Sequence, residues 1–139
     1  MDMSTLPDSL TRINKTNQLF LTHNIFIDTL NAKLYSCGGD NNQGVTVFSL
    51  ASPEIPVQIG EEPLSSTSHD IFVRNDTAFI NDGTSGLLIY DFSDAGNPFL
   101  IGSLSSYPQQ GYNHSGWLNE DGSIYVLADE THGKDLKIL

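Results

Sequence analysis

The chain has 139 residues, and its 17 Asp and Glu against 6 Lys and Arg give a formal net charge of −11. This balance disfavours a nucleic-acid partner, because phosphate backbones are met by clustered Lys and Arg. Cys37 has no second cysteine with which to form a disulfide. No apolar run reaches about 18 residues, so no membrane span is expected, and residues 1–18 show no secretory signal peptide.

The first 22 residues carry the weakest pattern of the chain. Two segments within them, residues 10–13 and 18–21, fit either a strand or an ordinary loop. From His23 onward, short apolar runs alternate with clusters of Asn, Asp, Gly, Ser and Pro, which break helices and separate strands.

The order of these parts repeats from three histidines, His23, His69 and His114, which are 46 (69 − 23) and 45 (114 − 69) residues apart. Three strands are predicted after each histidine. They cover residues 25–27, 34–35 and 45–48 after His23, residues 71–73, 79–80 and 87–90 after His69, and residues 116–118, 125–127 and 136–138 after His114. The first two copies add a Pro-bearing link and a fourth strand, which covers residues 99–101 in the second copy. The apolar runs from residue 71 to 101 are nearly continuous, which predicts a sheet covered on both faces.

A period of about 40 to 50 residues with four strands in each unit is typical of a β-propeller, whose blades pack face to face. We therefore predict an all-β fold, a β-propeller fragment of about two and a half to three four-stranded antiparallel blades. Residues 1–22 would be the end of a preceding blade or a leading loop, 23–68 and 69–113 two full repeats, and 114–139 a partial one. Since propellers usually close with four to eight blades, the remaining blades of a parent protein are expected partners.

The three repeated histidines are the most informative polar residues. The first strand of a blade lies nearest the central axis, so His23, His69 and His114 are predicted to converge at one mouth of the channel. There they would bind a ligand or a divalent metal ion such as zinc or iron. The alternative is a framework role in which each histidine bonds to a nearby turn, for example His69 to Asp82. The repeat does not decide between them, because it copies framework residues as faithfully as functional ones.

Four further residues are candidates for a site. Asp129 and Glu130, in a turn of the third copy, are possible metal ligands or merely solvated charges. Trp117 either stacks on a ligand or fills the space between blades, and Asp70, beside a repeated histidine, is a candidate ligand-binding residue. No catalytic residue is predicted, because the sequence has no nucleophile elbow, phosphate-binding loop or Cys-x-x-Cys pair.

The segment GLLIYDFSDAGNPFLIGSL (86–104) resembles the LVIVD repeat, a propeller blade motif of bacterial and archaeal surface proteins. The ordered set HNIFID, SHDI and NHSGWLNEDGSIYVLADE is similar to the choice-of-anchor B family, over about residues 22–130. The resemblance implies an extracellular or surface-displayed propeller, and it brings no reaction and no catalytic residues.

Three hypotheses about function follow from these features. The first is a non-catalytic surface or secreted module that serves as a binding platform for a protein or glycan. The second is a metal-binding propeller with a histidine cluster at the channel, hydrolytic through a metal-activated water. The third is a truncated gene product with no independent function.

Overall fold

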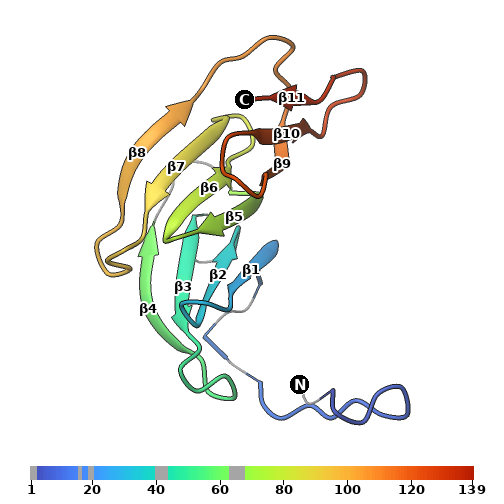
Figure 1. The fold of residues 1–139 in the computed structure, drawn as a ribbon, viewed down its shortest axis with the longest axis vertical. Coiled ribbons are helices and arrows are strands. Elements are labelled where there is room, and N and C mark those ends of the chain that lie inside the picture. Colours follow the sequence, from blue (N-terminus) through green and yellow to red (C-terminus); the bar gives the residue numbers. More distant parts are fainter. Residues whose placement is uncertain (1–2, 16, 19–20, 40–43, 63–67) are drawn as a thin grey trace.

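The computed structural model describes residues 3–15, 17–18, 21–39, 44–62 and 68–139. These residues contain eleven strands and no helix. The strands form three antiparallel sheets of four, four and three strands, each from strands consecutive in the sequence, and none of the sheets described closes on itself (Figure 1). The all-β class predicted from the sequence is confirmed, and the described residues offer no helix able to cross a membrane.

We call the sheets 1, 2 and 3. Sheet 1 contains β1 (Asn24–Asp28), β2 (Lys33–Cys37), β3 (Val45–Ser49) and β4 (Val57–Glu62). Sheet 2 contains β5 (Asp70–Arg74), β6 (Thr77–Asn81), β7 (Leu87–Asp91) and β8 (Phe99–Leu104). Sheet 3 contains β9 (Asn113–Leu118), β10 (Tyr125–Asp129) and β11 (Lys137–Ile138).

The predicted strands coincide with observed ones, except that Leu136 lies before β11. Residues 10–13 form no strand, although Thr11 takes part in an isolated bridge, and the segment 18–21 lies partly outside the described residues. Local turn chemistry explains much of this agreement. Between β5 and β6, Asn75 and Asp76 have φ angles of 50° and 59°, the left-handed conformation at both central positions that a tight two-residue hairpin needs.

The three sheets lie side by side in an arc. The first strands β1, β5 and β9 follow one another along its inner side, whereas β4 and β8 lie along its outer side (Figure 1). The first residues of β5 and β9 therefore come close in space although they are far apart in the sequence.

Two apolar clusters join the sheets. Between sheets 1 and 2, Tyr35 and Val47 pack with Ile71 and Ile80, and Phe92, from the link after β7, joins them. Fully burying one such side chain stabilises the fold by about 1.5–3 kcal/mol.

The second cluster lies between sheets 2 and 3, where Phe72 and Leu87 meet Leu118, Tyr125 and Leu127. Both faces of β5–β7 thus pack against apolar residues, as predicted, whereas Phe99, Leu100 and Ile101 of β8 are about half exposed.

Candidate functional site

The structure brings the three repeated histidines together in a row along the inner side of the arc. The ring centroids of His23 and His69 are 3.8 Å apart, and those of His69 and His114 are 4.3 Å apart. Each ring stands at or just before the first strand of its sheet, so the row follows from the side-by-side placement of β1, β5 and β9.

Hydrogen bonds from the rings connect neighbouring sheets. His23 Nδ1 lies 2.9 Å from the carbonyl oxygen of His69, and His69 Nδ1 lies 3.2 Å from that of His114. Because a carbonyl oxygen only accepts, Nδ1 of both rings carries the proton and donates it. The partner of His69 Nδ1 is therefore the backbone of the next sheet, in place of the Asp82 carboxylate suggested from the sequence. In the neutral form of each ring, the free lone pair is on Nε2.

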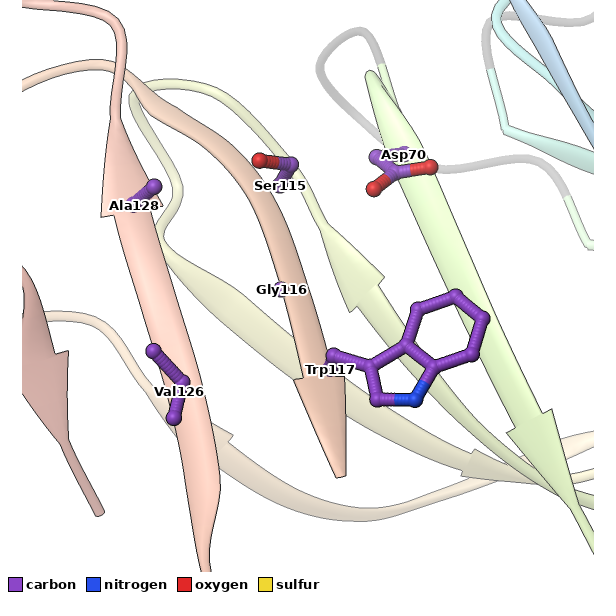
Figure 2. A pocket seen from close by; sticks show the side chains of 6 residues that line it. All are labelled: Asp70, Ser115, Gly116, Trp117, Val126 and Ala128. Carbon is purple, nitrogen blue, oxygen red and sulfur yellow. The ribbon is translucent and has the colours of Figure 1, made fainter. Parts of the chain in front are cut away.

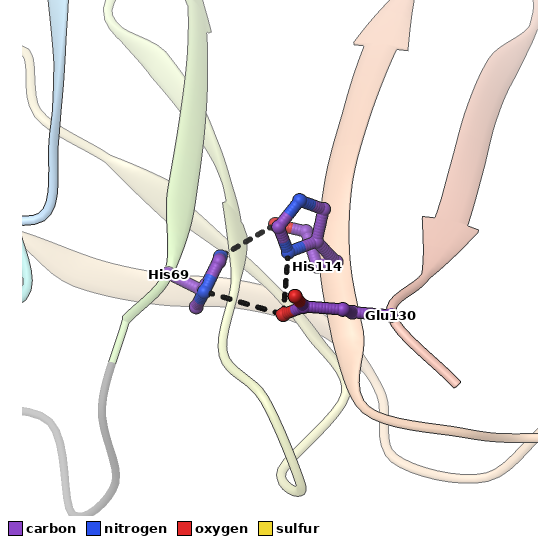
Figure 3. A group of neighbouring side chains, drawn as sticks. All are labelled: His69, His114 and Glu130. Carbon is purple, nitrogen blue, oxygen red and sulfur yellow. Dashed lines mark hydrogen bonds and ion pairs between the residues drawn. The ribbon is translucent and has the colours of Figure 1, made fainter. Parts of the chain in front are cut away.

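Glu130 completes a cluster at the junction of sheets 2 and 3. Its Oε2 lies 3.2 Å from His114 Nδ1 and 3.8 Å from His69 Nε2 (Figure 3). One ligand atom from each of the three residues lies within 4.8 Å of the other two. The Glu130 side chain is 62% exposed, whereas that of His69 is only 11% exposed.

The surroundings of His69 favour its neutral form. Burial lowers the pKa of its imidazole, and the neighbouring rings of His23 and His114 lower it further. The bond to the His114 carbonyl and the charge of Glu130 raise this pKa, but the balance stays below the usual value for histidine. A neutral imidazole is the form that binds metal ions.

Asp129 lies apart from this cluster, although it is next to Glu130 in the sequence. Its side chain is fully buried and accepts hydrogen bonds from Lys137 Nζ at 2.7 Å, Tyr107 Oη at 2.7 Å and the Gly111 amide at 2.8 Å. Burial alone raises the pKa of the carboxyl, but these hydrogen bonds outweigh it and leave the pKa lowered. Asp129 therefore holds sheet 3 together, and the two predicted acidic candidates have separate roles.

A second candidate region is a shallow cavity of about 290 Å³ on sheet 3. It is lined by Asp70 from β5, by Ser115, Gly116 and Trp117 from β9, and by Val126 and Ala128 from β10 (Figure 2). Trp117 is 62% exposed, and its indole meets the ring of Phe72 edge to face at a centroid distance of 4.6 Å. Asp70 Oδ1 accepts a hydrogen bond of 2.6 Å from Asn24 Nδ2. Among the described residues no fourth sheet packs on Trp117, which takes the place in β9 that Phe72 takes in β5.

Tyr112 is a neighbour of the histidine row that sequence analysis did not single out. Its ring meets that of His69 edge to face, with centroids 5.4 Å apart, and its carbonyl oxygen accepts the amide of Glu130 at 2.8 Å. Its only signal in the sequence is its position two residues before a repeated histidine.

A scan of the sequence against models of known protein families and a search of curated proteins find no match. The resemblance to the LVIVD repeat and to the choice-of-anchor B family therefore stays a prediction.

Proposed function

We propose that this chain is a non-catalytic binding module of the β-propeller type, and that its ligand is a neutral sugar unit of a glycan stacked on Trp117. The arc of antiparallel sheets with their first strands inside supports the propeller assignment. The resemblance to choice-of-anchor B proteins supports an extracellular or cell-surface location, where glycans are plentiful.

The observation that carries this proposal is the exposure of Trp117. Among the described residues the indole is 62% exposed and contacts Phe72 edge to face, so it offers a large apolar surface. A sugar ring presents a face of C–H groups that packs on an aromatic ring, and a rim of hydroxyl groups that need hydrogen-bond partners. The Asp70 carboxylate and the Ser115 hydroxyl line the same cavity as the indole (Figure 2) and would supply those partners.

Charge narrows the choice of sugar. The chain carries a formal net charge of −11, and the cavity contains a carboxylate and no Lys or Arg. An acidic sugar would therefore be repelled, so a neutral hexose or its N-acetyl derivative is the expected ligand.

Trp117 is the only tryptophan in the chain, so its fluorescence reports on this cavity directly. We expect a saturable change in intensity or emission wavelength when the protein is titrated with a neutral oligosaccharide selected on a glycan array. Asp70→Asn should weaken the binding by roughly tenfold, the loss of one charge-assisted hydrogen bond. Asp121→Asn, in the exposed turn before β10, serves as the control.

The glycan array also defines the results that would refute the proposal. Binding of no glycan by folded protein would refute the sugar proposal, and so would binding that Trp117→Ala leaves unchanged. Preference for acidic glycans would refute the charge argument.

A further inference from the structure

We infer that His69, His114 and Glu130 form a binding site for a divalent transition-metal ion, with zinc the best match, at the junction of sheets 2 and 3. This site is distinct from the Trp117 cavity, and the inference does not depend on the proposed glycan function.

The chemistry of the ligands selects the class of metal. Two imidazole nitrogens and one carboxylate oxygen form a three-ligand set that suits zinc, with a water or another donor in the fourth position. Calcium and magnesium prefer sets made of oxygen atoms. The cluster therefore favours zinc and its first-row neighbours.

The spacing is close to what such an ion requires. With metal–ligand bonds of about 2.0–2.1 Å and tetrahedral angles, two ligand atoms lie about 3.3 Å apart. The Glu130 oxygen is already 3.2 Å from His114 Nδ1 and 3.8 Å from His69 Nε2. One ligand atom from each of the three residues lies within 4.8 Å of the other two, so small side-chain movements would close the site. Glu130 is the most exposed of the three and is free to make most of that movement.

Hydrogen bonding prepares His69 for this role. Its Nδ1–H donates to the carbonyl oxygen of His114 (Figure 3), which fixes the ring orientation and leaves the lone pair on Nε2. Metal-ligating histidines usually donate their second nitrogen to a carbonyl or carboxylate in this way. The lone pair of Nε2 faces a carboxylate oxygen, an arrangement that a cation between the two atoms stabilises.

The surroundings of His114 Nδ1 support the metal site independently of the ligand spacing. Its Nδ1 is buried and makes no hydrogen bond of acceptable geometry within the described part of the chain, although Glu130 is close to it. A buried polar atom without a hydrogen-bond partner is uncommon and calls for an explanation such as an ion. A metal bound at Nδ1 would satisfy it.

The position of His23 separates this inference from a ring of three imidazoles. The cluster of three ligand atoms found among the described residues contains Glu130 and not His23, while His23 Nδ1 donates to the backbone carbonyl of His69 at 2.9 Å. His23 is thus expected to position His69 and not to bind the ion.

Calorimetric titration of the full chain with zinc, after removal of metal by a chelator, tests the site. We expect uptake to saturate at one equivalent and to raise the melting temperature, because an ion that binds only the native state stabilises it. Titration with cobalt(II) should give the visible absorption bands of a tetrahedral ion with nitrogen and oxygen ligands.

Glu130→Gln is the decisive variant, because Glu130 is largely exposed and the substitution should leave folding intact. It should weaken zinc binding by at least about tenfold, as should His114→Ala. His132→Ala is the matched control, since it removes an exposed histidine two residues from Glu130 and should change the affinity by less than about twofold.

Three results would overturn the assignment. They are the absence of saturable uptake by folded protein, equal losses in Glu130→Gln and His132→Ala, and unchanged affinity in Glu130→Gln. Circular dichroism of each variant distinguishes a lost ligand from a lost fold.

Discussion

Gly60 and Gly102 offer a direct test of how the sheets pack. They occupy matching places in β4 and β8, where each faces the irregularity in the neighbouring third strand. A methyl group at Gly60 would lie 1.7 Å from the carbonyl oxygen of Ala95, whereas at Gly102 the nearest atom would be Ile89 Cδ1 at 3.6 Å. The same substitution, Gly→Ala, therefore meets a backbone atom in one sheet and an ordinary contact in the other.

The magnitude follows from what must move. Real Cβ contacts shorter than 3.0 Å are essentially never found, so in Gly60→Ala the Ala95 loop must shift by at least 1.3 Å (3.0 − 1.7). The same loop carries Phe92, which is fully buried and packs edge to face on Tyr35 at 5.5 Å. Complete loss of a buried Phe costs about 3–5 kcal/mol, so we expect Gly60→Ala to lower the free energy of unfolding by roughly 2–4 kcal/mol. Gly102→Ala should change it by less than about 1 kcal/mol.

Urea unfolding followed by circular dichroism measures both variants against the unsubstituted protein. The slope with denaturant should stay the same, so that the shift in midpoint reports stability. Equal effects of the two substitutions, or a loss below about 1 kcal/mol for Gly60→Ala, would refute the packing of the sheet 2 loop on sheet 1.

Three other predictions concern buried groups. Cys37 is fully buried, and burial raises the pKa of its thiol to about 12. A thiol reagent should therefore label Cys37 only as fast as the protein opens. Rapid labelling of the native protein would contradict this prediction. Burial is the main reason that the pKa of the Glu62 carboxyl is raised in the folded protein. The ionised form therefore destabilises the fold, and this destabilisation grows as the pH rises from the pKa in the unfolded chain, about 4.3, through the higher pKa in the folded protein. Glu62→Gln should therefore increase the free energy of unfolding at pH 7 and have less effect below pH 4. An equal increase at both pH values would argue against a buried charge. Tyr107→Phe removes the hydroxyl that donates to the buried Asp129 at 2.7 Å and should cost about 1–3 kcal/mol in thermal or urea unfolding; an unchanged midpoint would mean that this bond does not support sheet 3.

The positions of the strands were predictable because their causes are local. Short apolar runs of up to four residues alternate with turn residues, and each run lies in a strand paired with its neighbour along the chain. The aromatic residues at the third position after each histidine were also predictable as neighbours. Phe26 contacts Phe72 at 5.4 Å, and Phe72 contacts Trp117 at 4.6 Å. Closure of the sheets into a ring is a longer-range property, and it stays a prediction.

The separation of the two neighbouring carboxylates follows from alternation, whereas the contact of Glu130 with the histidines does not. Adjacent side chains along a strand lie on opposite faces, and Asp129 lies on the buried face of β10 with Tyr125 and Leu127. The pairing of β10 with β9 skips His114, because Ala128 pairs with Ser115 and Asp129 with Asn113. Nothing in the sequence locates this irregularity, and His114 contacts Glu130 there.

From the sequence, a framework role and a metal-binding role for the histidines are alternatives, but the geometry makes the two roles compatible. An imidazole has two nitrogens, and His69 uses Nδ1 to tie sheet 2 to sheet 3 while Nε2 faces Glu130. His23 makes the same kind of tie between sheets 1 and 2. The ligand cluster found in the described residues, however, includes a carboxylate only at the next junction. A repeated framework bond thus orients the rings of His23 and His69, and it is the carboxylate, present in one copy, that turns this arrangement into a site for a cation.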